Sequence, residues 1–137
     1  MYADLFKLFL DSDNTLNVYK EEKLIFVSTK DRLLPLIDYI DGFANQHRQV
    51  VVFDKLTGNA AALLCIKAHC QEIYSPLGSQ LAGKTLDEYG IVYHFNRVVP
   101  FVQQANRKDM CPMEKLSIGK GPEEFYQTLK ARIINQP

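Results

Sequence analysis

The sequence has no excess charge of either sign, few cysteines and no long apolar run. Its 16 basic side chains balance 16 acidic ones, which argues against a sequence-independent nucleic-acid binder, because such proteins need surplus Lys and Arg to displace counterions. Three cysteines, an odd number, favour free thiols in a reducing compartment over a disulfide framework. No apolar run approaches the roughly 20 residues of a membrane span, and Asp4, Lys7 and Asp11 interrupt the only N-terminal candidate for a signal peptide. We therefore expect a cytoplasmic protein without a nucleic-acid or membrane partner.

The length and composition are typical of one globular domain. A chain of 137 residues, 47% of them apolar, can build a packed core without disulfides or a structural metal. The sequence contains no internal repeat and no low-complexity segment. We predict a single domain over residues 1–137, with a helical appendage at 1–12 and a C-terminal helix at 122–134. A homo-oligomer stays open at this point.

Strand and helix patterns alternate along the chain. Segments rich in Leu, Val, Ile, Tyr and Phe predict five strands, at residues 15–20, 23–28, 49–54, 71–75 and 91–95. Apolar residues at helical spacing predict helices at 2–10, 32–46, 59–69, 79–89 and 122–134. Pro76 and Gly78 indicate a break after the fourth strand, and residues 96–110 contain no clear strand. The alternation predicts right-handed crossovers and a mostly parallel sheet with helices on both faces.

The segment from Asp54 to Asn59 joins the expected central strand to the next helix. Lys55 supplies a mobile positive charge, and Gly58 allows a ligand to approach the backbone closely. The first turn of that helix carries no carboxylate to occupy its positive end. These features predict a phosphate site, although Thr57 and Gly58 could also serve only as a helix cap and a turn. The GxxxxGK[ST] spacing of a P-loop is absent.

A second candidate segment covers residues 106–114. Pro112 suits the first position of a helix, which makes Cys111 the N-cap and places Glu114 where it can bond back to the cap N–H. A thiol at a helix N-terminus close to Arg107 also favours its thiolate form, whereas the neighbouring Glu114 opposes that form. Cys111 is therefore either a structural cap or a nucleophile.

Together, the sequence DKLTGNAAALL at 54–64 and the sequence CPMEK at 111–115 resemble an uncharacterised, largely prokaryotic family described as a domain of unknown function. The resemblance covers roughly residues 14–117. It implies a cytidine-deaminase-like fold, which is a three-layer α/β/α sandwich with a five-stranded mixed sheet and the N-terminal β-hairpin at one side. It implies no particular activity, because the role of that family is not established.

The sequence departs from the zinc site of a deaminase. Such a site needs a His or Cys at the start of one core helix, two Cys at the start of the next, and a Glu that shuttles protons. Thr57, Gly58 and Asn59 supply none of these groups, and the Cys-x-x-Cys spacing survives only as Cys111 and Glu114. We therefore expect no metal and no cofactor. A divergent nucleoside or nucleotide deaminase is the least favoured function.

The preferred hypothesis is that a nucleotide or nucleotide-derived phosphate ligand binds in this zinc-free pocket. The expected ligand-binding residues are Asp54, Lys55, Thr57, Gly58, Asn59, Asn106 and Arg107. Asp54 would hold a ribose hydroxyl or orient Lys55. In an enzymatic version, Lys55 or Cys111 is the nucleophile and Glu114 the acid/base. The alternative is a non-catalytic sensor or protein-interaction domain, and the sequence does not decide whether the protein is an enzyme.

Overall fold

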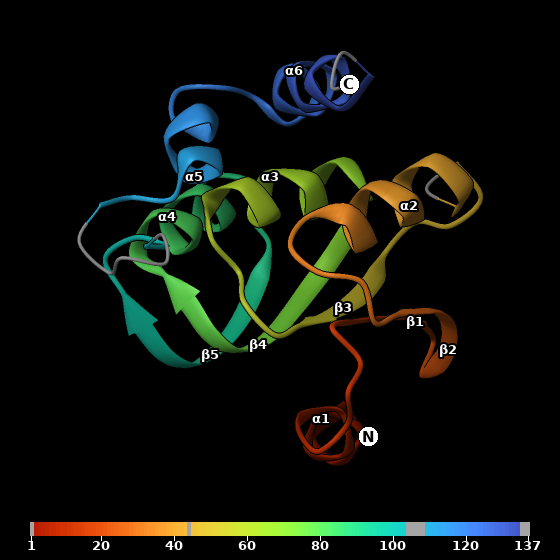
Figure 1. The fold of residues 1–137 in the computed structure, drawn as a ribbon. Helices are drawn as coiled ribbons and strands as arrows, with labels where there is room; N and C mark the ends of the chain where they lie inside the picture. Colours follow the sequence, from red (N-terminus) through yellow and green to blue (C-terminus); the bar gives the residue numbers. More distant parts are fainter. Residues whose placement is uncertain (1, 44, 104–108, 135–137) are drawn as a thin grey trace.

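The computed structural model describes residues 2–43, 45–103 and 109–134 of the chain (Figure 1). These residues form an α/β fold with one five-stranded sheet and six helices. In chain order the elements are α1 (Tyr2–Leu10), β1 (Leu16–Lys20), β2 (Lys23–Ser28), α2 (Leu34–Phe43), β3 (Val50–Asp54), α3 (Asn59–Lys67), β4 (Cys70–Ser79), α4 (Gln80–Glu88), β5 (Val92–Val99), α5 (Pro112–Ser117) and α6 (Pro122–Ile134).

The sheet is mixed, with strand order β2-β1-β3-β4-β5. The predicted hairpin is present, and its first strand, β1, pairs antiparallel with both β2 and β3. The remaining neighbours, β3 with β4 and β4 with β5, are parallel. Four of the five strands therefore run in the same direction, as the alternation predicts, and the hairpin adds one reversed strand, β1, beside the central one, which makes the sheet mixed as the resemblance implies.

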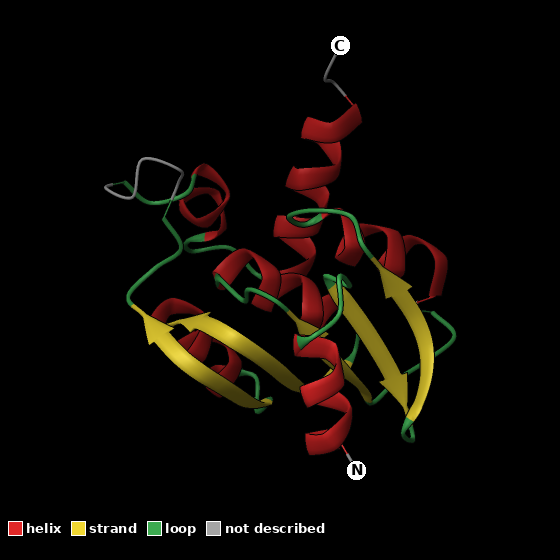
Figure 2. Ribbon diagram, turned by 60° about the horizontal axis from the view of Figure 1, so that its bottom comes forward, coloured by secondary structure: helices red, strands yellow, loops and turns green. Residues whose placement is uncertain are grey.

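The helices cover the two faces of the sheet very unequally. The connections β2-α2-β3, β3-α3-β4 and β4-α4-β5 each join parallel strands and all advance in the same direction across the sheet. Right-handed crossovers that advance in one direction place their helices on one face. Figure 1 shows α2, α3 and α4 on that face, with α5 and α6 outside α3. The opposite face carries α1 (Figure 2).

Strand β3 lies at the centre of two apolar clusters, one on each face of the sheet. Val52 packs in the larger cluster beneath the helices, whereas Val51 and Phe53 belong to the smaller cluster beneath α1. This alternation follows from the two-residue period of a strand. Phe6 and Phe9 of α1 are buried in the smaller cluster. Helix α1, predicted as a helical appendage over residues 1–12, thus packs on the sheet and contributes buried side chains to the smaller cluster.

Strands β4 and β5 extend further than their sequence patterns indicate. β4 continues through Pro76 to Ser79, and β5 continues into the segment for which no strand was expected. The pairing of β3 with β4 reaches only to Tyr74, so Pro76 lies where β4 has lost the strand ladder to β3 and its missing N–H is tolerated. Gly78 lies under an aromatic ring: a Cβ atom there would be 2.2 Å from Cδ2 of Phe95. The predicted break at these two residues is therefore wrong, because β4 continues through both.

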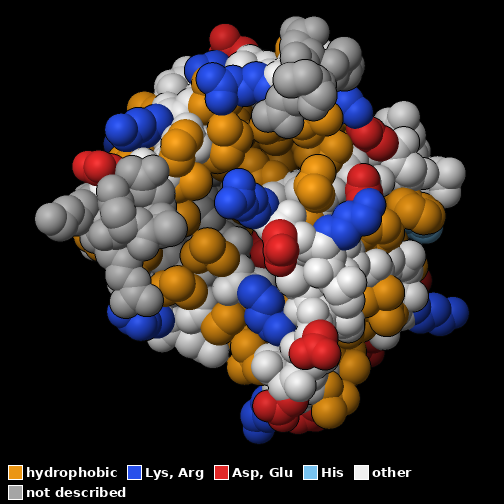
Figure 3. Space-filling view, in the orientation of Figure 1, with side chains coloured by type: hydrophobic (Ala, Val, Ile, Leu, Met, Phe, Trp, Pro, Cys, Tyr) orange, Lys and Arg blue, Asp and Glu red, His pale blue; other side chains and the backbone are white. Residues whose placement is uncertain are grey.

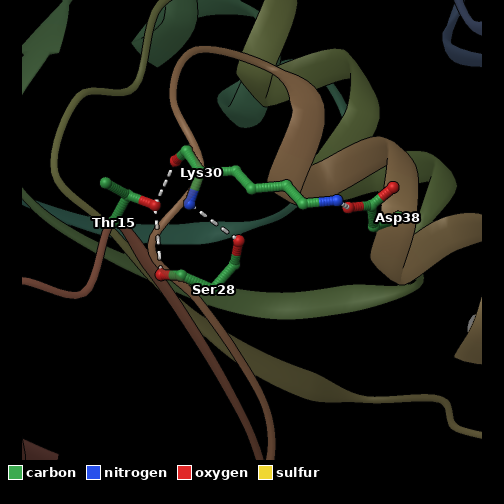
Figure 4. Close-up of polar contacts among 4 residues, drawn as sticks. All are labelled: Thr15, Ser28, Lys30 and Asp38. Atoms are coloured by element: carbon green, nitrogen blue, oxygen red, sulfur yellow. Dashed lines mark hydrogen bonds and ion pairs between the residues drawn. The ribbon is translucent and has the colours of Figure 1, made fainter.

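A small polar network fixes the open end of the hairpin to α2 (Figure 4). The Thr15 hydroxyl donates to the carbonyl oxygens of Ser28 and Lys30, and the Lys30 N–H donates to the Ser28 hydroxyl at 3.1 Å. Lys30 Nζ lies 2.7 Å from the carboxylate of Asp38 on α2. This ion pair is solvent-exposed and therefore contributes little stability, so the hydroxyl bonds define the turn.

The surface shown in Figure 3 intersperses basic and acidic side chains, as the balanced composition leads one to expect. Among the residues that the structure describes, no helix has the length and the apolar character needed to cross a membrane.

Candidate functional site

The first turns of α3 and α4 lie together at the carboxyl end of the parallel strands. The loop after β3 forms one parallel bridge to β4. In this bridge the Thr57 N–H donates to the Leu77 carbonyl at 2.9 Å, and the Ser79 N–H donates to the Thr57 carbonyl at 3.0 Å. The buried Thr57 and Ser75 hydroxyls are 2.6 Å apart. Thr57 thus links the loop to β4 and brings the two helix N-termini side by side.

The carboxylate of Glu114 occupies this place. Glu114 comes from α5 and is only 2% exposed. Its Oε1 accepts the Ala60 N–H in the first turn of α3 at 3.1 Å, and its Oε2 accepts the Val102 N–H at 3.3 Å and the Ser79 hydroxyl at 3.5 Å. The Ser79 oxygen in turn accepts the Ala82 N–H and caps α4. An anion therefore sits at both helix N-termini, as their dipoles favour, and it belongs to the chain itself.

Gly58 is required by the closeness of Glu114 rather than by a turn. Its φ of −89° is accessible to any residue. A Cβ atom at this position would lie 2.5 Å from Cγ2 of Val102 and 2.7 Å from Oε1 of Glu114. The predicted close approach to the Gly58 backbone exists, and in this structure it is made by the Glu114 carboxylate.

Asn59 ties three helices together. Its Nδ2 donates to the Ser117 hydroxyl of α5 at 2.9 Å, and its Oδ1 accepts the hydroxyl of Thr85 on α4. The Ser117 hydroxyl donates in turn to the Glu114 carbonyl at 2.6 Å. The amide nitrogen of Asn59 thus holds α5 over the site, and its amide oxygen joins α3 to α4.

Asp54 and Lys55 point to opposite faces of the sheet, because consecutive strand residues alternate. Asp54 faces the helices, and its Oδ1 accepts the Leu56 N–H at 3.3 Å. Burial raises the pKa of Asp54 to about 7. Lys55 faces α1, where its Nζ donates to the Ser12 carbonyl at 2.8 Å and lies 4.7 Å from the ring centroid of Phe9. The expectation that Asp54 orients Lys55 is therefore wrong, and Lys55 is not beside Glu114.

Cys111 is the N-cap of α5, as the position of Pro112 predicts, and its side chain is half-buried without a capping bond. The expected bond from Glu114 back to the cap is replaced: the Cys111 N–H donates to the Val102 carbonyl at 2.8 Å, and Glu114 turns toward α3. The Glu114 carboxylate instead stabilises the N-termini of α3 and α4, which are longer helices. This stabilisation outweighs that of a capping box in α5, which has six residues. Asn106 and Arg107 lie outside the described residues.

Five contributors to the site were missed from the sequence: the Ser75, Ser79, Thr85 and Ser117 hydroxyls and the Val102 N–H. Ser79 had a usable signal, since a Ser directly before a helical pattern is a favoured N-cap. Within residues 2–43, 45–103 and 109–134 there is no group of three or more His, Cys, Asp or Glu side chains placed to hold a metal ion.

The fold and this closed polar site define an α/β protein with an open mixed sheet whose two central helix N-termini share one carboxylate. A family model for a domain of unknown function, DUF1893, matches residues 5–133, and the chain belongs to that family. The crystal structure of a DUF1893 family protein from Thermotoga maritima is similar, with 30% sequence identity and a TM-score of 0.85. The match covers 96% of this chain and 88% of that one. A search of curated proteins finds no significant match.

Proposed function

We propose that this protein binds a nucleotide-derived phosphate ligand at the carboxyl end of its parallel strands, and that the phosphate takes the place of the Glu114 carboxylate. The observation that carries the proposal is the anion already held at the N-termini of α3 and α4. Its donors are the Ala60 N–H, the Val102 N–H and the Ser79 hydroxyl. Phosphate oxygens accept the same kinds of bond and carry more negative charge than a carboxylate.

The exchange requires α5 to move, because Glu114 is almost fully buried beneath it. Helix α5 has six residues, too few to be stable without tertiary contacts, and its polar links to α3 are the bonds made by Glu114 and Ser117. The absence of a side chain at Gly58 leaves the backbone of α3 open to whichever anion is bound. Glu114 thus serves as an internal placeholder that keeps the site satisfied when no ligand is present.

We also propose the finer classification of the fold as a cytidine-deaminase-like three-layer sandwich over roughly residues 14–117. The support is the juxtaposition of two helix N-termini, since a zinc deaminase draws its metal ligands from the first turns of two successive core helices. In this chain those turns begin with Asn59 on α3 and Gln80 on α4 instead of His or Cys, so the second turn is that of α4 and not the Cys111–Glu114 segment of α5 that the sequence suggested. The pocket would then serve ligand binding in place of metal-dependent deamination.

Binding without nucleophilic chemistry by Lys55 is the better supported version, because Lys55 lies on the α1 face of the sheet. Cys111 stays a candidate for covalent chemistry, since its half-buried thiol lies on the helix that would move. The sensor alternative is favoured by one observation: Glu114 joins α3 to α5, so its displacement would report ligand occupancy as a shift of α5.

The test compares the wild-type chain with Glu114→Gln in thermal unfolding. The amide removes the competing anion and turns an N–H₂ group toward N–H donors, so we expect a loss of about 1–3 kcal/mol of stability. Inorganic phosphate and nucleoside monophosphates should then raise the melting temperature of Glu114→Gln more than that of wild type. A ligand at about a hundred times its Kd stabilises by about 2.7 kcal/mol, which is easily seen.

Glu124→Gln is the matched control, because Glu124 is an exposed Glu on α6 and should respond like wild type. Phosphate-free nucleosides separate recognition of the base from recognition of the phosphate. The proposal is wrong if neither phosphate nor any nucleoside monophosphate stabilises wild type or Glu114→Gln.

A further inference from the structure

Helix α5 is docked by polar side chains rather than by apolar ones. Its buried residues are Glu114 and Ser117, whereas its apolar residues Met113 and Leu116 are only partly buried against the core. By contrast, α1 and α6 each bury two apolar side chains. Because the hydrophobic stabilisation of a helix scales with the apolar area that it buries, lifting α5 would cost less than lifting either of those helices.

The polar bonds that hold α5 can be replaced by water. The Glu114 carboxylate accepts two backbone N–H groups and one hydroxyl, and the Ser117 hydroxyl accepts the Asn59 amide at 2.9 Å. Water offers bonds of the same kind, so each of these contributes only modestly to the docking of the helix. In the described residues none of the groups that donate to Glu114 is a cation, so opening would also restore the hydration of a buried charge.

The chain can bend where α5 ends. Gly119 has a φ of 77°, a left-handed conformation that favours glycine, and a Cβ atom at Gly119 or Gly121 would meet nothing within 4 Å. Figure 1 shows the loop from α5 to α6 on the outside of the molecule. Beyond this loop α6 is anchored by Phe125, whose side chain is fully buried. The two glycines therefore separate a weakly docked helix from a firmly docked one.

We propose that α5 is a lid over the site, which opens by turning about Gly119 while the rest of the fold stays intact. The start of the helix would stay attached, because the Cys111 N–H donates to the Val102 carbonyl at 2.8 Å. Opening would carry Glu114 away from the N-termini of α3 and α4 and expose their donors to solvent. The admission of a phosphate ligand by this lid rests on the proposed function, whereas the opening itself does not.

Two N–H groups of α3 distinguish opening of the lid from unfolding of the helix. The Ala60 N–H donates to Glu114, so its exchange with solvent requires α5 to leave. The Ala62 N–H donates to the Gly58 carbonyl, so its exchange requires α3 itself to open. Amide hydrogen exchange is measured by NMR on the full chain, without ligand, over a series of low urea concentrations. After correction for intrinsic rates, Ala60 should exchange more than about tenfold faster than Ala62 and with a weaker dependence on urea.

Gly119→Ala and Gly121→Ala are the matched variants. Alanine at 119 strains the left-handed φ of the closed lid, so it should speed the exchange of Ala60 about five- to thirtyfold and leave that of Ala62 unchanged. Gly121 does not have a positive φ, so Gly121→Ala should leave both rates close to those of wild type. Neither new methyl group meets an atom within 4 Å, so both variants should keep the far-UV circular dichroism of wild type.

Equal exchange of Ala60 and Ala62 with the same urea dependence would overturn the proposal, because α5 would then leave only when α3 unfolds. An unchanged Ala60 rate in Gly119→Ala, or the same increase in Gly121→Ala, would also overturn it, because the opening would not turn about Gly119. Failure of the proposed function is distinguishable from these outcomes, since it is measured by ligand stabilisation and the exchange experiment contains no ligand.

Discussion

Asp54 is an ionisable side chain in a buried position, so the stability of the protein depends on its protonation. It ends β3 and faces the helical layer, where it is 9% exposed. Burial raises its pKa from 3.8 to about 7, against the smaller lowering effect of the Leu56 and Lys55 N–H groups. The side chain therefore changes its protonation near neutral pH, next to the loop that carries Thr57 and Gly58.

The pH dependence of stability should reveal this group. Between pH 3.8 and about 7 the folded protein retains the Asp54 proton while the unfolded chain has lost it. The free energy of unfolding should therefore fall as the pH rises through this window and level off above it, with a total change of up to a few kcal/mol. Asp54→Asn should remove this contribution. Urea unfolding of both proteins at several pH values checks it, and parallel profiles would contradict it.

Gly58 provides a second prediction at the residue scale. In Gly58→Ala the new methyl group overlaps the Glu114 carboxylate and Val102, so the carboxylate must leave its donors, and we expect a loss of about 1–3 kcal/mol of stability. Gly42→Ala is the control, because a Cβ at Gly42 of α2 meets nothing within 4 Å. That variant should gain up to about 1 kcal/mol by restricting the unfolded chain. Equal effects in chemical denaturation would contradict the close approach at Gly58.

At the scale of elements, α1 is the one helix of the described residues on its face of the sheet, and it holds its place through aromatic contacts. The ring of Phe9 is 1% exposed, packs 5.7 Å from that of Phe53 and lies beneath the Lys55 ammonium. Lys55 in turn donates to Ser12, just after the end of the helix. The lysine predicted to bind a phosphate thus fastens α1 to the end of β3.

Two alanine substitutions on α1 test this role. Phe9→Ala should cost about 3–5 kcal/mol, because it leaves a cavity between α1 and β3. Leu8→Ala, next to it on the same helix, should change stability by no more than about 0.5 kcal/mol, because Leu8 is 69% exposed. Chemical denaturation measures both. Equal, small effects would mean that α1 is an appendage, as its sequence alone indicated.

At the scale of the whole molecule, the order in which the chain adds its strands determines which face of the sheet the helices cover. Because every crossover from β2 to β5 advances in the same direction, all three connecting helices lie on one face. In the part of the chain that the structure describes, the other face carries only the short α1, which leaves the flank at β5 uncovered. The site around Glu114 lies beneath α5 on the opposite, helical face.

The amino-acid sequence by itself determined the local elements. The continuous apolar run of β3, the buried helix α3, the hairpin and the Pro-led starts of α5 and α6 follow from propensity and periodicity, which act over a few residues. The sequence also showed that the first turn of α3 carries no carboxylate of its own, which is the basis of the predicted phosphate site.

Only the tertiary structure decided what occupies that site. Glu114 is 54 residues away from Ala60, the N–H donor it satisfies, and no local pattern encodes such a contact. The separation of Asp54 from Lys55 and the passage of β4 through Pro76 likewise depend on which neighbours each strand has. Local preference fixes where elements form, whereas packing between distant segments fixes which side chains meet.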